Sequence, residues 1–266
     1  MKNLKSVKWL KDNLNLSNLV LLDASQHSTD SQSQKIECIP GSRHFDLKNK
    51  FSNTSSSLPN TFPSTEQFQE EARELGVYSD SIIVIYDNKG IYTSPRAWWM
   101  FKTFGHDHVF VLNGGLPAWK AMNGELSCNY DTPGKGNFKA NVNLKKARFF
   151  EAILNNVEID TELVIDARSA KRFNSEVPES RKGLRSGTIP KSINLPYTDV
   201  LNDNLIKTNE ELETIFKPII ASKKPLIFSC GSGVTACILH LAFSEITNDH
   251  CSIYDGSWTE WGTLLD

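Results

Sequence analysis

The chain has 266 residues, with 29 lysines and arginines, 31 aspartates and glutamates, and a formal net charge of −2 at pH 7. This length accommodates two domains with separate cores, and the balanced charge offers no basic surface that would attract nucleic acid or an anionic membrane. The apolar runs are only as long as strands, so we expect no membrane span. The basic start lacks the apolar core and the cleavage site of a signal peptide, which predicts a cytoplasmic protein.

The cysteines are spread along the whole chain. There are five of them, an odd number, at Cys38, Cys128, Cys230, Cys237 and Cys251. Neither their number nor their spacing is typical of a disulfide framework, and no Cys-x-x-Cys pair or Cys/His cluster suggests zinc. We therefore expect a reducing compartment, no metal and no cofactor.

Four short patterns of the first half return in the same order in the second half. The pairs are 19–24 with 163–167, 39–42 with 189–192, 82–87 with 225–230, and 113–119 with 255–261. Their separations, measured between matching residues, are 143, 150, 143 and 142 positions. Nearly constant offsets in conserved order indicate an internal duplication.

Each half alternates apolar runs of strand length with amphipathic segments of helix length, which predicts an α/β fold with a largely parallel sheet flanked by helices. Two capping patterns, Ser64-x-x-Gln67 and Thr208-x-x-Glu211, indicate where helices begin. The stretch from 129 to 137 is polar and rich in turn-forming residues. We predict one domain over 1–123, a linker region over 124–146 and a second domain over 147–266.

Cys230 stands between an apolar, β-rich run and an apolar segment of helix length, with a Gly-Ser-Gly turn at 231–233 directly after it. Backbone N–H groups and the positive end of a helix dipole converge on such a position and favour the thiolate, the nucleophilic form of cysteine. The alternative, a buried structural cysteine, needs neither the turn nor its glycines. In the first half the same position is Asp87, so we predict one catalytic and one non-catalytic copy.

The loop after Cys230 argues against a neighbouring chemistry. Cysteine phosphatases use a similar strand–loop–helix cradle, but their longer loop ends in an arginine that binds the phosphate with two hydrogen bonds. Here Thr235 and Ala236 occupy the fifth and sixth positions after the cysteine. We therefore exclude phosphoryl transfer.

Over nearly its whole length the chain resembles the two-domain rhodanese-like sulfurtransferases. The motifs that carry the resemblance are Ser94-Pro95-Arg96-Ala97-Trp98-Trp99-Met100-Phe101, Asn113-Gly114-Gly115, Asp166-Ala167-Arg168-x-x-x-Arg172-Phe173, Gly187-Thr188-Ile189-Pro190, 230–236 and 254–261. Within that family, Cys-Gly-Ser-Gly-Val-Thr is similar to the loop of members that use 3-mercaptopyruvate. Members that prefer thiosulfate, a compact dianion, carry a basic pair where this chain has Gly231 and Ser232.

The resemblance implies two tandem rhodanese-like domains and a covalent mechanism. Cys230 would take sulfane sulfur from 3-mercaptopyruvate as a persulfide and pass it to a thiol or another nucleophile. The substrate would lie against Gly231, Gly233, Val234 and Thr235, because the backbone amides of 231–235 would stabilise the thiolate and the persulfide anion. The implied partners are a small-molecule sulfur donor and a thiol acceptor, with a thioredoxin-like protein as one candidate.

Three further side chains acquire roles from the resemblance. Ser232 would donate a hydrogen bond to the sulfur or to the substrate, and its alternative role is a helix N-cap. Arg172 and Arg181, nine positions apart, match the family's substrate-binding arginines, and the guanidinium fork suits a carboxylate. The alternative for both arginines is a surface ion pair with Glu176 or Glu179. The segment from 171 to 181 has the composition of an irregular loop.

The chain departs from the family in its proton relay, which the mercaptopyruvate enzymes build from an acid after a Phe-Asp pair and a histidine before a Leu-Pro. Lys48 follows Phe45-Asp46-Leu47 here, and serines, among them Ser56, precede Leu58-Pro59. Two alternative functions therefore stay open. One is a thiosulfate:cyanide sulfurtransferase, and the other is a sulfur-carrying binding module with little turnover.

Overall fold

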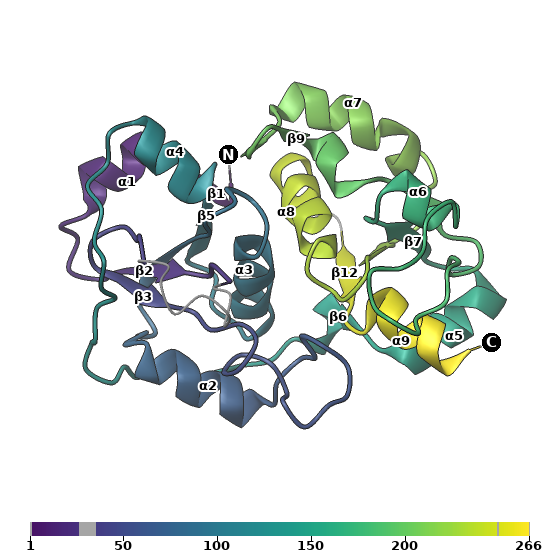
Figure 1. Cartoon of the computed structure of the whole chain (residues 1–266), viewed down its shortest axis with the longest axis horizontal. Coiled ribbons are helices and arrows are strands. Elements are labelled where there is room, and N and C mark those ends of the chain that lie inside the picture. The colour runs from purple at the N-terminus through teal and green to yellow at the C-terminus, as the bar shows by residue number, and fades with distance from the viewer. Residues whose placement is uncertain (1, 27–35, 249, 266) are drawn as a thin grey trace. The chain divides into compact units, whose positions relative to one another are not determined.

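The structure is a computed structural model that describes residues 2–26, 36–248 and 250–265. The chain divides into two compact units (Figure 1). The first unit comprises Met1–Thr54, Phe62–Val142 and Asp203–Leu205, and the second comprises Ser55–Thr61, Asn143–Asn202 and Ile206–Asp266. Among the described residues, no helix has the length and apolar character needed to cross a membrane.

The first unit is built on a five-stranded sheet whose strands are all parallel, in the order β1-β5-β4-β2-β3. The strands are β1 (Leu4–Lys5), β2 (Leu19–Asp23), β3 (Ser42–His44), β4 (Ile82–Tyr86) and β5 (Val109–Leu112). The helices of this unit are α1 (Val7–Asn13), α2 (Thr65–Glu74), α3 (Ser94–Thr103) and α4 (Gly115–Ala121).

Helices cover both faces of the first sheet. On one face Leu10 of α1 and Trp119 of α4 pack against Val84 of β4 in a buried apolar cluster. On the other side Phe68 of α2 stacks on the ring of Phe104, directly after α3, with 4.0 Å between the ring centroids. The sheet is therefore buried on both faces, as its continuous apolar strands predict.

The second unit repeats this arrangement with the order β6-β12-β11-β7-β8, again with parallel pairs only. The strands are β6 (Ala147–Arg148), β7 (Leu163–Asp166), β8 (Ile193–Asn194), β11 (Leu226–Ser229) and β12 (Cys251–Tyr254). The helices are α5 (Phe150–Ile159), α6 (Ala170–Phe173), α7 (Asn209–Ile220), α8 (Ala236–Ile246) and α9 (Ser257–Leu264), with short 3₁₀ turns η1 (Leu144–Lys146) and η2 (Tyr197–Val200). A separate ribbon pairs β9 (Leu201–Asn202) with β10 (Leu205–Ile206). The predicted class, two α/β domains with parallel sheets flanked by helices, is confirmed.

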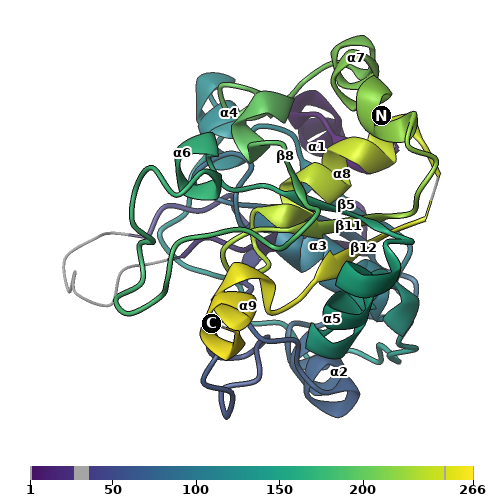
Figure 2. The same cartoon turned by 90° about the vertical axis from the view of Figure 1, so that its right-hand side faces the viewer.

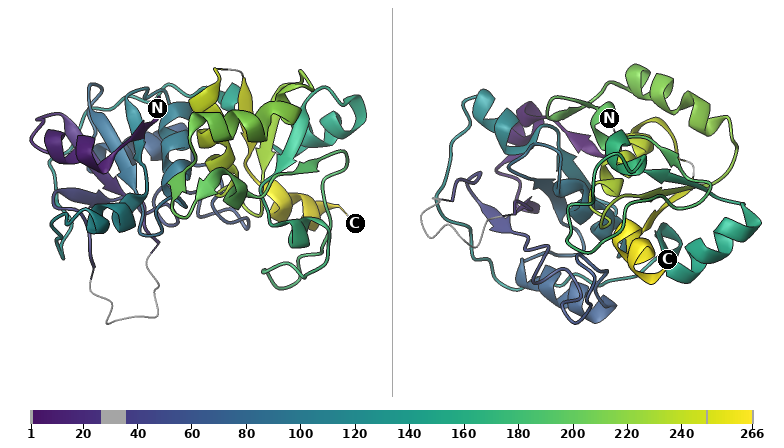
Figure 3. Two further views of the ribbon diagram at one scale, coloured as in Figure 1. Left: turned by 90° about the horizontal axis from the view of Figure 1, so that it is seen from above. Right: turned by 45° about the vertical axis from the view of Figure 1, so that its right-hand side comes forward.

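The core of the second unit fixes the strand that leads to Cys230. Ile227 of β11 faces a buried cluster that includes Ile153 of α5 and Trp258 of α9. Phe228, the next residue, faces the opposite side and packs against Phe243 of α8 at 5.9 Å between ring centroids. Strands with helices on both faces are visible in Figures 2 and 3. Because β11 is fully buried on both faces, its carboxyl end is held firmly in place.

The duplication extends to backbone conformation. Gly41 and Lys191 both have left-handed backbones, with φ of 78° and 62°. In each copy of this turn the serine that follows, Ser42 or Ser192, donates its hydroxyl hydrogen bond to the carbonyl three residues earlier. Equivalent turns at equivalent sheet positions show that the repeat is structural as well as sequential.

The two capping patterns mark helix starts, as predicted, but only one is reciprocal. Thr208 and Glu211 form a complete capping box at the start of α7. Ser64 caps α2 by accepting the hydrogen bond of the Gln67 amide. The side chain of Gln67 donates instead to the carbonyls of Lys50 and Ser52, and so ties α2 to the preceding loop.

Candidate active site

Cys230 lies directly after β11 and six residues before the first residue of α8, at the carboxyl edge of the second sheet. It is 1% exposed. Its carbonyl accepts the amide hydrogen bond of Trp258 at 2.9 Å, and its own amide donates to Ser257 Oγ at 3.1 Å. The backbone of the cysteine is therefore held by one side-chain hydroxyl and one backbone amide at the start of α9.

Ser257 is the residue that organises this loop, and it was not among the predicted site residues. Its hydroxyl oxygen accepts hydrogen bonds from the amides of Cys230 and Gly233, both at 3.1 Å, and donates to the carbonyl of Tyr254 at 2.8 Å. Its φ is 51°, a left-handed conformation that is unfavourable for serine. The equivalent residue of the first unit, 142 positions earlier, is Gly115, which also has φ of 51°. The sequence offered one signal for this residue, because the second repeat has a serine where the first repeat has a glycine.

Ser257 already binds one of the loop amides. The Gly233 amide is directed to Ser257, whereas the amides of 231, 232, 234 and 235 have no acceptor among the described residues. Val234 is buried and Thr235 is half-buried. Cys237, the second residue of α8, is buried and its thiol donates to the carbonyl of Gly233 at 3.2 Å, which fits a packing role. Four of the five predicted loop amides thus remain for an anionic sulfur.

Ser232 is half-buried, and its hydroxyl oxygen accepts a hydrogen bond from Asn60 Nδ2 at 3.2 Å. The N-cap residue of α8 is Thr235, and its side chain makes no capping bond. The alternative role of Ser232 as a helix N-cap is therefore wrong. Asn60, with φ of 58°, belongs to the segment 55–61, which is part of the second unit. Sequence reasoning missed this residue, because nothing local links positions 60 and 232.

Arg172 and Arg181 both border the catalytic loop. A Cβ atom added to Gly231 would lie 3.1 Å from Arg172 Nη2 and 3.7 Å from Arg181 Nη1. Arg181 also donates to Thr259 Oγ1 at 3.0 Å, and Thr259 donates to the carbonyl of Gly231. Two guanidinium groups therefore meet beside Gly231, the residue that follows Cys230. The absence of a side chain at position 231 leaves room for them.

The predicted loop over 171–181 is only partly irregular, because Arg172 lies on the short helix α6. This single turn forms because the amides of Arg172 and Phe173 donate to the carbonyl of Ser169. The rest of the segment, 174–181, contains neither helix nor strand. The helical turn fixes the direction from which Arg172 approaches the cysteine loop.

A buried carboxylate, Glu179, holds Arg172 in place. Arg172 Nε donates to Glu179 Oε2 at 3.2 Å, and its Nη2 atom contacts the same oxygen. Arg168 donates to the other oxygen, Oε1, at 2.7 Å, and also binds Asp166. The Glu179 side chain is 1% exposed, against 26% for Arg172. The ion pair of Arg172 with Glu179 that the alternative named is therefore present, but it is not a surface pair, because Glu179 is buried and shared with a second arginine.

These charges do not cancel at the site. Among the residues that the structure describes, the guanidinium groups of Arg168, Arg172 and Arg181 form ion pairs with only two carboxylates, those of Asp166 and Glu179. One positive charge is left beside the cysteine loop. Arg168 pairs with Asp166, and both side chains are fully buried.

The first unit fills the equivalent loop with its own side chain. One carboxyl oxygen of Asp87 accepts the amide hydrogen bonds of Tyr92, Thr93 and Ser94, at 2.9–3.0 Å. The other oxygen accepts from the amide of Lys89 at 2.9 Å. The loop of this fold thus gathers amides around an acidic group. In the first unit that group is a fixed carboxyl and not a nucleophile.

The residues at the positions of the family's proton relay have other surroundings. Lys48 is exposed on the first unit. Ser56 Oγ accepts hydrogen bonds from the amide of Leu58 at 3.1 Å and from Thr61 Oγ1 at 3.0 Å, within its own loop. Among the described residues Ser56 forms no hydrogen bond with Cys230. Lys48 belongs to the first unit, whereas Cys230 belongs to the second.

The model of the rhodanese-like domain matches this chain twice, over residues 6–122 and 147–264. The chain belongs to the rhodanese family. The two matched segments contain the two parallel sheets described above, and Cys230 lies in the second.

Relatives of this rhodanese-family protein match it over nearly its whole length. It is 36% identical to the 3-mercaptopyruvate sulfurtransferase of Escherichia coli K12, over 97% of this chain and 94% of that protein. It is 38% identical to thiosulfate/3-mercaptopyruvate sulfurtransferase 1, mitochondrial, of Arabidopsis thaliana, over 98% of this chain and 76% of that protein. The crystal structure of SseA from E. coli matches with a TM-score of 0.85 at 33% identity, covering 97% of this chain and 99% of SseA. The protein is an enzyme of the sulfurtransferase class.

Removing the Ser257 hydroxyl from this sulfurtransferase is expected to lower kcat/KM by at least about tenfold, because two buried amides lose their acceptor and the loop is no longer fixed. Ser257→Gly is the test variant, since glycine tolerates the left-handed backbone that alanine would strain. Stopped-flow alkylation of Cys230 should slow in parallel with turnover. Parent rates in both assays would show that the loop is held without Ser257.

Proposed function

We propose that the protein transfers sulfur from 3-mercaptopyruvate to a thiol acceptor through a persulfide on Cys230. The observation that carries this proposal is the meeting of Arg172 and Arg181 beside Gly231, next to a buried cysteine at the carboxyl edge of the sheet. The names of the E. coli and Arabidopsis relatives, both of which include 3-mercaptopyruvate, support the choice of donor.

The reaction proceeds in two displacements at sulfur. The Cys230 thiolate attacks the sulfur of mercaptopyruvate, an S–S bond forms and the C–S bond breaks, and the electron pair leaves on the enolate of pyruvate, which then takes up a proton. In the second half the thiolate of the acceptor attacks the outer sulfur of the persulfide. This step produces an acceptor persulfide, restores the Cys230 thiolate and makes the kinetics ping-pong.

The charges of the site suit this donor. The carboxylate of mercaptopyruvate carries one negative charge, and the arginine network beside the loop leaves one positive charge uncancelled. Arg172 and Arg181 present guanidinium groups that bind a carboxylate through paired hydrogen bonds. We assign the binding of the substrate carboxylate to these two arginines.

The loop after Cys230 supplies hydrogen-bond donors for the sulfur. In the proposed mechanism the amides of Gly231, Ser232, Val234 and Thr235 stabilise the negative sulfur of the thiolate and of the persulfide, as fixed dipoles do at an anionic transition state. The Ser232 hydroxyl accepts from Asn60, so its own hydrogen is available for the sulfur or the substrate. Gly233 contributes indirectly, because its amide and its left-handed backbone, with φ of 73°, fix the shape of the loop.

Thiosulfate is the second candidate donor, because two guanidinium groups near a cysteine also suit a sulfonate. The Arabidopsis relative is named for both donors. Thiosulfate would bring two negative charges to the Cys230 thiolate and the one uncancelled positive charge, whereas mercaptopyruvate brings one. The charge balance therefore favours mercaptopyruvate.

A side-by-side assay of both donors tests the proposal. We expect kcat/KM for mercaptopyruvate to exceed that for thiosulfate by at least about tenfold, which corresponds to roughly 1.4 kcal/mol of transition-state preference. Many turnovers per protein molecule are expected with a small thiol as acceptor, which distinguishes an enzyme from a sulfur-carrying module. An equal or reversed donor preference would assign the protein to thiosulfate instead.

A further inference from the structure

Each of the two units contains a short segment from the other half of the sequence. Ser55–Thr61 belongs to the second unit, although the stretches on either side of it belong to the first. Asp203–Leu205 does the reverse and belongs to the first unit. We call Ser55–Thr61 the second-unit arm and Asp203–Leu205 the first-unit arm.

The two arms are equivalent positions of the internal repeat. Asn60 and Asp203 are 143 positions apart, which is the separation of two of the four repeated patterns. Both residues have left-handed backbones, with φ of 58° and 51°. Asparagine and aspartate adopt this conformation more readily than other residues that carry a side chain. The exchange of arms is therefore part of the duplicated design.

Each arm reaches the loop at the carboxyl end of a central strand. In the second unit, Asn60 Nδ2 lies 3.2 Å from Ser232 Oγ and 3.5 Å from the carbonyl oxygen of the same residue. In the first unit, a Cβ atom added to Gly90 would lie 2.5 Å from Asn204 Cβ. Ser232 follows Cys230 by two positions, and Gly90 follows the equivalent aspartate by three. Only the second-unit arm thus reaches a loop that follows a cysteine.

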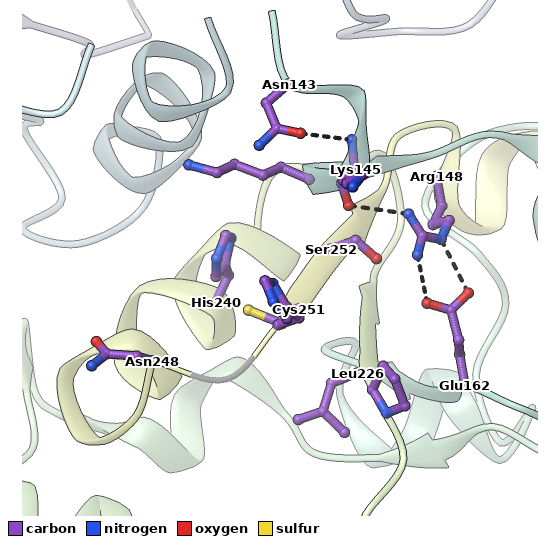
Figure 4. A pocket seen from close by; sticks show the side chains of 12 residues that line it. Asn143, Lys145, Arg148, Glu162, Leu226, His240, Asn248, Cys251 and Ser252 are labelled. Carbon is purple, nitrogen blue, oxygen red and sulfur yellow. Dashed lines mark hydrogen bonds and ion pairs between the residues drawn. The ribbon is translucent and has the colours of Figure 1, made fainter. Parts of the chain in front are cut away.

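The cavity at the other end of β11 is remote from this cysteine. It opens where β11 and β12 begin, and Leu226 and Ser252 belong to its lining (Figure 4). Cys230 follows the last residue of β11, and a strand rises by about 3.3 Å per residue, so the cysteine lies about 13 Å further along. A substrate on Cys230 therefore contacts segments at the carboxyl edge, where the second-unit arm meets Ser232.

The hydrogen bond from Asn60 determines what the Ser232 hydroxyl can do. An amide Nδ2 only donates, so it occupies a lone pair of Ser232 Oγ and leaves the hydroxyl hydrogen uncommitted. That hydrogen has no acceptor among the residues that the structure describes. The amide of Asn60 does not titrate near neutral pH, so it holds Ser232 as a hydrogen-bond donor and cannot carry a proton onward.

The second-unit arm is braced by its own hydrogen bonds. Ser56 Oγ accepts from the amide of Leu58 at 3.1 Å. Thr61 Oγ1 lies 3.0 Å from Ser56 Oγ and 2.8 Å from the carbonyl oxygen of Leu58. These contacts lie on both sides of Asn60 in the chain and limit the directions that its side chain can take. A donor fixed in advance needs no rearrangement when charge develops during the reaction.

We propose that Asn60 is a positioning residue of the sulfur transfer, which directs the Ser232 hydroxyl hydrogen to the reacting atoms beside Cys230. This role rests on the function proposed above, in which Cys230 takes up sulfur. Negative charge moves from the attacking sulfur to the leaving group as the transition state forms, and a hydrogen bond held ready for that charge raises the rate without tightening donor binding. Asn60 therefore acts on the rate at saturating donor, whereas Arg172 and Arg181 act on KM.

A double-mutant cycle with Ser232 tests this role in the full-length protein. The readout is the single-turnover rate constant of sulfur uptake by Cys230, measured by rapid-quench mass spectrometry. Asn60→Gly keeps the left-handed backbone and removes the donor. It should lower the rate constant at saturating donor by about threefold to tenfold and change the half-saturating concentration by less than about twofold.

The same substitution should have almost no further effect in Ser232→Ala. Two residues that act through one hydrogen bond are not additive, whereas independent effects multiply. Asn60 also has an interaction outside this pair, and the cycle separates its loss from the loss of the bond to Ser232. A full additional loss in the Ser232→Ala background would overturn the proposal, because Asn60 would then act without Ser232.

Two further variants separate the hydrogen bond from the shape of the arm. Asn60→Asp keeps the size of the side chain, and Asp203 shows that aspartate adopts the same backbone at the equivalent position. A carboxylate only accepts, so Ser232 would donate to it and lose its free hydrogen. This variant should lose at least as much activity as Asn60→Gly. Asp203→Gly, which changes an exposed side chain of the first-unit arm, is the control and should take up sulfur at the parent rate.

Parent rates in Asn60→Asp would also overturn the proposal, because the shape of the arm would then be sufficient. The cycle is measured with whichever donor the parent uses faster. A preference for thiosulfate would contradict the donor proposed above, and the cycle would still report on Asn60. Additive losses would contradict the role of Asn60 with either donor.

Discussion

Cys230→Ser is expected to abolish sulfur transfer and to leave the fold intact. Cys230 is 1% exposed, and its backbone is held by the hydroxyl of Ser257 and the amide of Trp258, contacts that a serine at position 230 would preserve. The alcohol oxygen is a poor nucleophile toward sulfur and cannot form a persulfide. A multiple-turnover assay should fall to background, while far-UV circular dichroism and the unfolding midpoint stay close to those of the parent.

Mass spectrometry of the donor-treated parent protein should show one added sulfur atom, on the peptide that contains residue 230. Cys237→Ser is the matched control, because this thiol is buried seven residues further on and donates to the carbonyl of Gly233. It should keep the label on Cys230. Sulfur found on Cys237 or on the half-buried Cys251 would contradict the assignment of the nucleophile.

Arg172→Ala and Arg181→Ala are each expected to raise KM for mercaptopyruvate by about 10- to 100-fold. Loss of a charged hydrogen-bond partner costs roughly 1.5–3 kcal/mol, and the carboxylate is charged in both the ground state and the transition state, so kcat should change less than KM. Steady-state kinetics of both variants with mercaptopyruvate measure this effect. Lysine at either position should rescue the KM only in part, because it keeps the charge and loses the fork.

The two variants differ in their expected stability. Arg172→Ala leaves the buried Glu179 with Arg168 as its one remaining arginine partner, so the free energy of unfolding should fall by about 1–3 kcal/mol. The Arg181 side chain is half-buried and donates one hydrogen bond to Thr259. Its loss should therefore change the free energy of unfolding little. Lys171→Ala, an exposed neighbour, is the control for both measurements. An unchanged KM in both arginine variants would remove them from the site.

Much of the fold could be predicted because its signals are local. Strand and helix periods, the capping residues Ser64 and Thr208, and the constant offset between the repeats all follow from residues that are close in sequence or from the comparison of two copies. The same holds for Cys230, since a strand, a glycine turn and a helix in succession define its surroundings. The prediction that 171–181 is irregular was wrong at α6, because a single helical turn leaves almost no periodic signal.

The parts of the site that sequence reasoning missed depend on contacts between distant positions. Ser257 accepts from Cys230 across 27 residues, and Asn60 donates to Ser232 across 172. The sequence alone could suggest that Arg172 pairs with a glutamate. It could not show that Glu179 is buried, shared with Arg168 and adjacent to the cysteine loop.

The sequence by itself determined the two α/β copies and the strand, turn and helix around Cys230, because each of these rests on a local pattern. Only the tertiary structure decided which loop amide is bound by Ser257 and which arginines border Gly231, because these features arise where separate segments meet at the carboxyl edge of one sheet. The charge left at the site is likewise set by the burial of Asp166 and Glu179 among three arginines. Hydrogen bonds and ion pairs of this kind act over a few ångströms, so their partners are fixed only when the chain is folded.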